Sequence, residues 1–250
     1  MKLLVDIGNS SVKWACLVQG KLGESSSTAH QGSMPADVFA AWLRLTKPLD
    51  VVVANVAGAA VMFELKSWAQ EQWGMNVSAP LAVAVGWGVR NAYANAEKLG
   101  VDRWAALLAA KQNYIGHPCC VIDCGTALTI DVVGADGQHL GGLIVPGLSM
   151  MRAALVDNTT GIEPSKNKES DEGLLFACNT EDAVERGTLS AIVATINNSV
   201  KNIEATVNAD VVCLLSGGDG EMLLPYLSGN FIFDEALVLK GLAIISGEAQ

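Results

Sequence analysis

The sequence has few charged residues, few histidines and no long hydrophobic run. Only 17% of its 250 residues are charged, and 16 Lys and Arg against 26 Asp and Glu give a net charge of -10. Such a surplus of negative charge repels nucleic acid and anionic membranes. No window reaches the roughly 18 consecutive apolar residues of a membrane span. We therefore expect neither nucleic acid nor a membrane as a partner, and any anionic ligand has to be held by a local cluster of donors.

Metal-binding and disulfide patterns are missing as well. No pair among the six cysteines has the two-residue spacing of zinc and redox sites, and the three histidines are scattered. Several cysteines lie in apolar runs, where a thiol packs as a small hydrophobic group. We therefore expect reduced thiols in a cytoplasmic protein. The hydrophobic share of 50% is enough for a large buried core.

What the sequence does contain is one pattern that occurs twice, at the ends of two predicted strands. The apolar run 3–5 leads into Asp6, Gly8 and small polar residues, and the apolar run 120–122 leads into Asp123-Cys124-Gly125-Thr126. One copy alone is more simply explained as an ordinary turn, because Asp and Gly are common turn residues. Two copies predict related half-domains that face one ligand, since glycine turns let phosphates approach backbone N–H groups.

Helical and strand-like segments alternate along the rest of the chain, which is typical of an α/β protein. The apolar spacing predicts helices over 36–45, 59–73, 102–113, 181–205 and 237–246. It predicts strands over 50–56, 81–85, 128–133, 140–145 and 211–215. Segment 157–172 is the most polar stretch, and its part 165–172 is predicted to be a mobile loop.

Several polar residues at predicted element ends have two readings. Asp102 at a helix start is more simply an N-cap, although catalysis is compatible with that position. Arg103 is either a solvated first-turn residue or a bidentate clamp for a carboxylate. Thr180 before two acidic residues is typical of a helix start. Gly217-Gly218 after a strand fits a flexible turn and a surface for a flat ligand equally well.

Five segments together resemble type III pantothenate kinase, within the actin-like ATPase superfamily that includes sugar kinases and heat-shock chaperone ATPases. They are Asp6–Ser10, Leu99–Trp104, Asp123–Thr126, Gly141–Leu148 and Leu237–Leu242. The resemblance implies a duplicated actin-like (ribonuclease H-like) α/β fold with a central nucleotide cleft. Its half-domains would be 1–115 and 116–250, with the last helix packing back on the first.

The resemblance also implies roles for individual residues. ATP would be bound by Thr126 and by the first phosphate loop, which comprises Asp6, Ile7, Gly8, Asn9, Ser10, Ser11, Val12 and Lys13. The pantothenate site falls on Tyr93, Gly100, Val101, Asp102, Arg103 and Thr180, with Asp102 as proton acceptor. Asp6 would hold hydrated Mg²⁺, and Asp123 a monovalent cation, K⁺ or NH₄⁺.

The implied activity is ATP-dependent phosphorylation of pantothenate to 4'-phosphopantothenate, the first step of coenzyme A biosynthesis, by a cytoplasmic homodimer. Two alternatives stay open: an actin-like kinase for another small hydroxylated acceptor, and a non-catalytic regulatory relative. Arg103 beside Asp102 favours an acidic acceptor. The net charge and the absence of a basic helix argue against direct contact with DNA.

Overall fold

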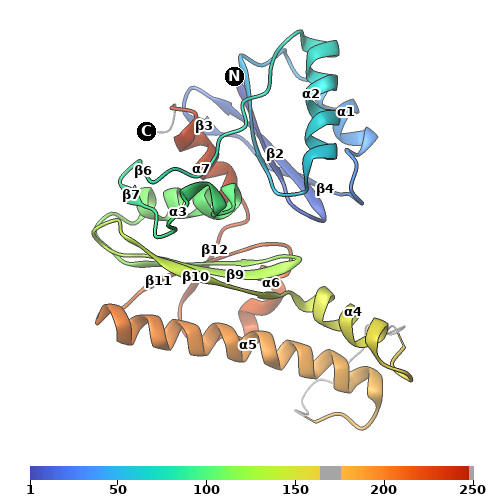
Figure 1. Cartoon of the computed structure of the whole chain (residues 1–250), viewed down its shortest axis with the longest axis vertical. Helices are drawn as coiled ribbons and strands as arrows, with labels where there is room; N and C mark the ends of the chain where they lie inside the picture. Colours follow the sequence, from blue (N-terminus) through green and yellow to red (C-terminus); the bar gives the residue numbers. More distant parts are fainter. Residues whose placement is uncertain (164–175, 248–250) are drawn as a thin grey trace. The chain divides into compact units, whose positions relative to one another are not determined.

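Residues 1–163 and 176–247 are described in the computed structural model of the protein, and they divide into two units (Figure 1). Unit 1 takes its described residues from 1–119, 133–141 and 235 onward. Unit 2 takes them from 120–132 and 142–234. Each unit has its own sheet and helices.

The sheet of unit 1 has the strand order β3-β2-β1-β5, and β4 also pairs with β2. Its strands are β1 (Lys2–Ile7), β2 (Ser11–Val18), β3 (Lys21–Leu22), β4 (Ser26–Ala29) and β5 (Asp50–Asn55). β1 is antiparallel to β2 and parallel to β5. Successive side chains of a strand point to opposite faces. Leu3, Val5 and Ile7 accordingly join one core cluster, and Leu4 joins another.

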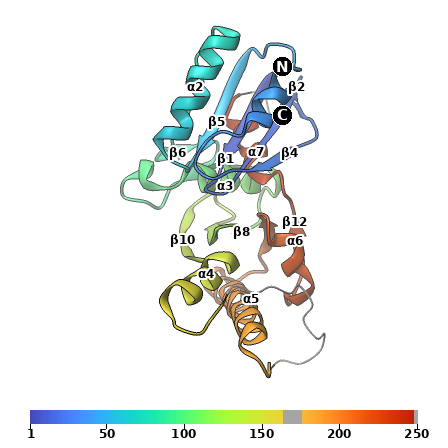
Figure 2. The same ribbon diagram turned by 90° about the vertical axis from the view of Figure 1, so that its right-hand side faces the viewer.

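Helices cover both faces of this sheet (Figures 1 and 2). α1 (Ala36–Trp42) and α2 (Ala59–Trp73) pack on the cluster that contains Leu3. α3 (Val101–Asn113) and α7 (Leu237–Ile245) pack on the cluster that contains Leu4. The connection from α2 to α3 holds β6 (Val85–Gly86), β7 (Val89–Arg90) and the 3₁₀ helix η1 (Ala96–Lys98).

α3 and α7 approach each other closely at Gly241. A side chain at this position would collide with the backbone of Ala105. Glycine is therefore required here by helix packing, and the α3 N-terminus that carries Asp102 is fixed to the C-terminal helix.

Unit 2 repeats the strand order of unit 1. Its sheet has the order β10-β9-β8-β11-β12, in which the first four strands correspond to β3-β2-β1-β5. The strands are β8 (Cys119–Cys124), β9 (Ala127–Val133), β10 (His139–Pro146), β11 (Val212–Ser216) and β12 (Phe231–Phe233). The two Asp-x-Gly segments lie at the C-terminal ends of β1 and β8, which hold equivalent places in the two sheets.

The helices of unit 2 are α4 (Leu148–Asn158), α5 (Thr180–Val207), α6 (Gly220–Leu223) and the 3₁₀ helix η2 (Leu224–Tyr226). The long helix α5 lies along the sheet (Figure 1) and buries Ile192 and Ile196 against strand residues such as Ile122 and Leu215. Within the described ranges, no helix has the length and apolarity needed to cross a membrane.

Most of the predicted elements are confirmed, and one is wrong. α2 spans the predicted 59–73 and α5 extends the predicted 181–205 by a few residues. The predicted strand 81–85 is absent: only Val85 is in a strand, and Leu81 and Val85 are 58% and 67% exposed. The polar segment 157–172 begins inside α4, which ends at Asn158, and the predicted loop 165–172 lies outside the described residues.

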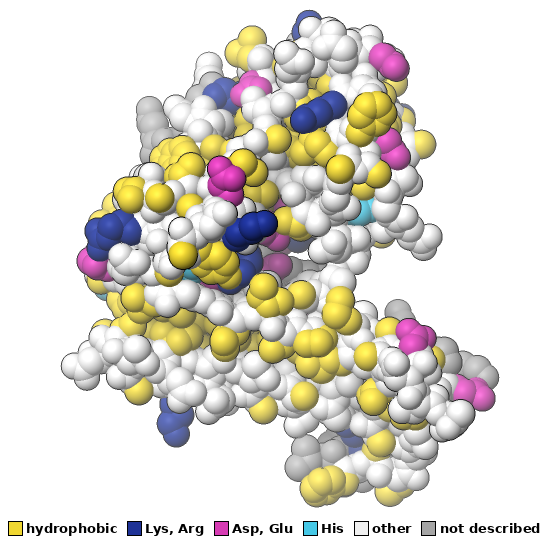
Figure 3. All heavy atoms as spheres, viewed as in Figure 1, with side chains coloured by type: hydrophobic (Ala, Val, Ile, Leu, Met, Phe, Trp, Pro, Cys, Tyr) yellow, Lys and Arg dark blue, Asp and Glu magenta, His cyan; other side chains and the backbone are white. Residues whose placement is uncertain are grey.

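The surface reflects the low charge of the sequence. On the face shown in Figure 3, charged side chains are few, and hydrophobic atoms are spread between them. A cationic site for an anionic ligand on such a surface depends on a small number of individual side chains.

Candidate active site

The first group of predicted site residues lies where β1 passes into β2. The Gly8 N–H donates to the Ser11 carbonyl at 3.0 Å and closes the turn. The antiparallel ladder places Asp6 opposite Lys13. A half-buried carboxylate and a half-buried ammonium group thus stand beside the same turn.

Gly8 lacks a side chain although the protein leaves room for one. A Cβ here would lie 3.5 Å from the Ser11 carbonyl oxygen, which is an ordinary van der Waals separation. Gly8 is also absent from the residues with positive φ. The fold therefore does not require glycine at this position, and the space above the backbone is open to an external group such as a phosphate.

The other residues of this loop differ in what they can offer a ligand. Ile7 and Val12 are fully buried in the core, so only their backbone groups are available. Asn9 and Ser10 are exposed at the tip of the turn. Backbone N–H groups and small polar side chains are the donors that phosphate-binding turns commonly use.

The start of α3 positions the predicted proton acceptor. The N-cap of α3 is Gly100, not Asp102, so the interpretation of Asp102 as the N-cap is wrong. Asp102 is half-buried, and its Oδ1 accepts the N–H of Arg103 at 2.8 Å. A Cβ on Gly100 would lie only 2.5 Å from that same Oδ1. The glycine therefore makes room for the Asp102 carboxylate.

Arg103 is a buried residue, so its interpretation as a solvated first-turn side chain is wrong. It is only 8% exposed. Its Nη1 donates to the Tyr93 hydroxyl at 3.0 Å, and its guanidinium carbon lies 5.8 Å from the centre of the Tyr93 ring. A buried cation loses hydration and gains from charge-assisted hydrogen bonds to an anion. Arg103 is thus suited to a carboxylate ligand.

Tyr93 is in turn held by neighbours that the sequence did not indicate. Its backbone N–H donates to Asn91 Oδ1 at 2.9 Å. Its ring is stacked on His139, with 6.1 Å between the ring centres and 14° between the planes. The fully buried His139 also accepts the Ala92 N–H through Nδ1 at 3.3 Å. Tyr93, Arg103 and Asp102 therefore form one fixed cluster within unit 1.

In unit 2, two other loops pack against the end of β8. The Asp219 N–H donates to the Cys124 carbonyl at 3.0 Å, and the Gly147 N–H donates to the Thr126 carbonyl at 2.9 Å. Gly217 has φ +91°, and a side chain there would collide with the Cys124 backbone. The turn that contains Asp123 and Thr126 is thus held in place by backbone contacts from both sides.

The two glycines of the predicted pair, Gly217 and Gly218, therefore differ in what a side chain would meet. Gly217 is required by packing and backbone conformation, whereas Gly218 is exposed and nothing lies within 4 Å of a Cβ built on it. Only Gly218 leaves room for a flat ligand.

Two ionisable groups beside this turn are shifted by burial. Burial raises the pKa of the Asp219 carboxyl, and the positive charge of Arg152 partly offsets that effect. Burial also raises the pKa of the Cys124 thiol, and the negative charges of Asp123 and Asp219 add to the shift. The Cys124 thiol is therefore neutral at physiological pH and acts as a packing residue.

Thr180 is the first residue of α5 and is exposed. It is not needed to begin the helix, because Asn179 is the N-cap and its side chain accepts the Asp182 N–H at 2.8 Å. The Thr180 hydroxyl is therefore available for another function.

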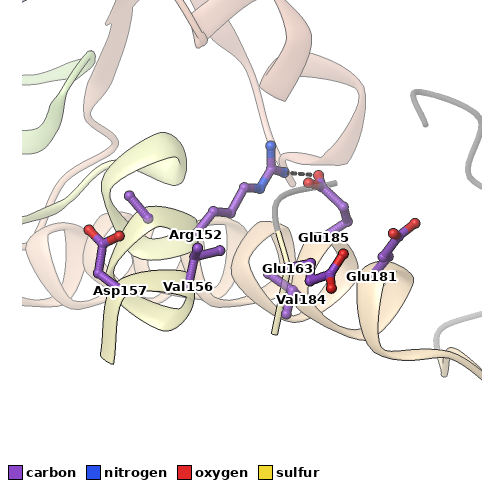
Figure 4. Close-up of a pocket in the computed structure, with 8 residues that line it drawn as sticks. Arg152, Val156, Asp157, Glu163, Glu181, Val184 and Glu185 are labelled. Carbon is purple, nitrogen blue, oxygen red and sulfur yellow. Dashed lines mark ion pairs between the residues drawn. The ribbon is translucent and has the colours of Figure 1, made fainter. Parts of the chain in front are cut away.

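A cavity of about 380 Å³ lies between α4 and α5 in unit 2 (Figure 4). Arg152 crosses it, donating from Nη2 to Glu185 at 2.6 Å and from Nε to Thr188 at 3.2 Å. Its lining also includes Asp157, Glu163 and Glu181. Carboxylates outnumber the single arginine, so this cavity is unsuited to an anionic substrate, and it contains none of the predicted site residues.

The donor set for metal ions is sparse. The described residues contain no group of three or more His, Cys, Asp or Glu side chains placed to hold a metal ion. Hydrated Mg²⁺ requires only one or two carboxylates in addition to substrate phosphates, and the single carboxylate of Asp6 fits that requirement.

Comparison with known proteins connects this geometry to a family. The family model for type III pantothenate kinase matches residues 2–202. A type III pantothenate kinase from Nitrosococcus oceani is 39% identical over 255 residues, covering 100% of this chain and 95% of the relative. One from Nitrosospira multiformis is 37% identical, covering 99% of this chain and 92% of the relative.

The chain belongs to the type III pantothenate kinase family.

Solved structures show the fold of this type III pantothenate kinase family member. MreB 5 of Spiroplasma citri, solved with AMPPNP, has a TM-score of 0.51 at 12% identity and covers 98% of this chain and 96% of its own. The activator of 2-hydroxyisocaproyl-CoA dehydratase from Clostridium difficile, solved with ADPNP, has a TM-score of 0.53 at 12% identity, with coverage of 98% and 93%. The predicted actin-like fold is confirmed.

Proposed function

We propose that the protein transfers the γ-phosphoryl group of ATP to pantothenate, giving 4'-phosphopantothenate in the first step of coenzyme A biosynthesis. The observation that carries this proposal is the arrangement at the start of α3. There, the Asp102 carboxylate accepts the backbone N–H of Arg103, and the buried Arg103 guanidinium donates to the Tyr93 hydroxyl. This pairing suits a substrate with a hydroxyl group and a carboxylate, and it occurs in a chain that belongs to the pantothenate kinase family.

On the acceptor side, the hydroxyl oxygen of pantothenate attacks the γ-phosphorus of ATP, and ADP leaves. Asp102 accepts the proton of that hydroxyl group. Arg103 pairs with the pantothenate carboxylate, while Tyr93 orients the guanidinium. Gly100 and Val101 supply backbone close to Asp102. The exposed hydroxyl of Thr180 is the proposed further contact with pantothenate.

On the nucleotide side, the loop Asp6–Lys13 and Thr126 bind the phosphates of ATP. Gly8 allows close approach to the backbone, and Lys13 adds a positive charge. Asp6 would hold Mg²⁺ through water. The metal ion neutralises charge on the transferring phosphoryl group when it is bound.

Asp123 is the proposed ligand of a monovalent cation, K⁺ or NH₄⁺. This half-buried residue is the last but one of β8, the place in the unit 2 sheet that Asp6 holds in β1 of unit 1. The turn is fixed by backbone contacts, so its carbonyl oxygens can contribute to a preformed site for a large cation.

The assembly we propose is a cytoplasmic homodimer of chains that each contain two half-domains, 1–115 and 116–250, with the last helix of the second packed on the first. An apolar set on β10 and α4 supports self-association: Leu143, Ile144, Met150 and Leu155 are all at least 37% exposed. Exposed apolar side chains on an edge strand favour pairing with another chain. All six cysteines are free thiols, which fits a reducing compartment.

A coupled kinase assay with ATP and pantothenate tests the proposal. We expect phosphorylation in potassium or ammonium chloride and much lower activity in sodium chloride at the same concentration. Full activity in sodium alone would remove Asp123 from its cation-binding role. A panel of sugars and other small alcohols serves as the control, and a better acceptor in that panel would identify another kinase activity.

A further inference from the structure

The first phosphate loop is held by a histidine that follows β4 in unit 1. His30 is 8% exposed. Its Nε2 lies 2.7 Å from the Gly8 carbonyl oxygen, and the Gly32 N–H donates to its Nδ1 at 3.1 Å. The backbone N–H of His30 also donates to the Ser10 carbonyl at 2.9 Å. One residue therefore holds two carbonyl groups of the turn.

The partners of the imidazole define its tautomer. A backbone carbonyl can only accept a hydrogen bond, so Nε2 carries the hydrogen in the contact with Gly8. A backbone N–H can only donate, so Nδ1 is the acceptor for Gly32. The neutral ring uses both nitrogens, and the Gly32 contact orients the ring so that Nε2–H points at Gly8.

Holding the Gly8 carbonyl also determines the direction of a neighbouring donor. The Gly8 carbonyl and the Asn9 N–H belong to one planar peptide group, in which they point in opposite directions. Because His30 fixes that plane, it fixes the Asn9 N–H on the side of the turn away from the imidazole. The Gly8 N–H, in contrast, is already used by the Ser11 carbonyl.

We propose that His30 is a positioning residue for the nucleotide, which sets the Gly8-Asn9 peptide so that the Asn9 N–H donates to a phosphate oxygen of ATP. Donors fixed before binding reduce the ordering cost that the ligand otherwise bears. The inference rests on the proposed function only in that ATP binds this loop, and it is independent of the acceptor substrate.

The test is calorimetric titration of the full-length protein with Mg·AMPPNP in the absence of pantothenate. His30→Leu removes both side-chain bonds, and His30→Asn keeps an acceptor near the Nδ1 position but does not reach Gly8. His30→Gln places an amide N–H near the Nε2 position and preserves the donor. We expect Leu and Asn to weaken binding by roughly three- to tenfold, the loss that corresponds to one net hydrogen bond, and Gln to stay within about twofold of wild type.

Steady-state kinetics give a second readout that a general structural role does not produce. The Leu and Asn variants should raise KM for ATP by a similar factor and leave KM for pantothenate unchanged. His117→Leu and His117→Asn are matched controls, because His117 is exposed in the loop after α3 and lies outside the proposed site.

Three results would overturn the inference: unchanged Mg·AMPPNP affinity in the Leu and Asn variants, equal weakening in the Gln variant, or a parallel rise of both KM values. A wild-type protein that binds Mg·AMPPNP without phosphorylating pantothenate would reject the proposed function and leave the binding test of His30 valid. Failure of the wild type to bind Mg·AMPPNP would reject both.

Discussion

Glycines in the candidate site differ in what a side chain would meet at each position. At Gly217 and Gly147 a Cβ would collide with backbone of the same unit, so the fold alone explains these glycines. At Gly8 the nearest atom is 3.5 Å away, and the fold offers no reason for glycine. The distinction separates a packing requirement from a requirement set by a ligand.

Gly8→Ala should therefore impair nucleotide binding without destabilising the protein. We expect the free energy of unfolding to change by less than about 0.5 kcal/mol, as for an ordinary surface substitution. The added methyl group would occupy space needed by a phosphate and raise KM for ATP by roughly tenfold, which corresponds to about 1.4 kcal/mol. Urea unfolding and steady-state kinetics measure the two effects, and an unchanged KM for ATP would assign Gly8 to the turn alone.

Asp102→Asn should abolish most pantothenate phosphorylation while Mg·AMPPNP still binds. The amide preserves the shape of the side chain but cannot act as a base, so kcat should fall by roughly 10²–10⁴-fold. Coupled-assay turnover and calorimetry provide the two measurements. Near-normal turnover would exclude Asp102 as the proton acceptor.

A matched control for this substitution exists in α1. Asp37 is also the second residue of its helix, and its Oδ1 accepts the N–H of the next residue at 3.0 Å, as Asp102 Oδ1 does at 2.8 Å. Asp37→Asn thus reports the cost of changing a first-turn carboxylate. We expect it to leave kcat unchanged.

The sequence indicated which residues to consider but not their local contacts. Asp102 and Arg103 were predicted at a helix start, and they lie there. Gly100 as the N-cap, the burial of Arg103 and the stacking of His139 on Tyr93 depend on segments that are distant in the sequence. Neither residue type nor local spacing contains that information.

At the scale of elements, periodic apolar spacing predicted the helices well and the short strands poorly. α2 and α5 are long enough for the helical period to be clear. The segment 81–85 is apolar, but Leu81 and Val85 are exposed and the predicted strand does not form. Strand formation depends on a pairing neighbour as well as on composition. β12 has only three residues and gave no sequence signal.

The contact between α3 and α7 yields a prediction about packing. Gly241→Ala should lower the free energy of unfolding by about 1–3 kcal/mol, because the methyl group would force the helices apart at Ala105. Gly187→Ala in α5 is the matched control, because it adds the same methyl group to a helical glycine without a collision. Gly187 is exposed, and nothing lies within 4 Å of a Cβ there. It should raise stability by up to about 1 kcal/mol through helix propensity.

Urea unfolding of the two variants measures both changes. A Gly241→Ala protein as stable as wild type would show that α3 and α7 separate easily. Because α3 carries Asp102, we also expect this variant to lose turnover, which Gly187→Ala should retain.

For the whole molecule, the repeated strand order explains why two weak sequence signals were informative together. Asp6 and Asp123 are the last residues but one of β1 and β8, which occupy equivalent places in the sheets of units 1 and 2. Each turn alone had an ordinary explanation. The duplication of the fold is what placed the same residue pattern at the same place in each sheet.

The net charge of -10 leads to a prediction about ionic strength. ATP and pantothenate are anions, so the protein repels them at long range, while in the proposed site the buried Arg103 would attract the pantothenate carboxylate at short range. Added salt screens exposed, distant charges more than buried, adjacent ones. Raising the ionic strength from about 0.05 to 0.3 M should thus leave kcat/KM for pantothenate unchanged or increase it up to about twofold. Tetramethylammonium chloride at constant K⁺ and Mg²⁺ avoids a change in the specific cations.

Arg103→Gln separates the local attraction from the long-range repulsion. Loss of a charge-assisted hydrogen bond should raise KM for pantothenate by roughly tenfold or more at every ionic strength. The salt dependence should remain that of the wild type, because it arises from the whole surface. A several-fold fall in wild-type kcat/KM with salt would instead mean that exposed cations guide pantothenate to the site, and it would contradict the assignment of the attraction to the buried Arg103.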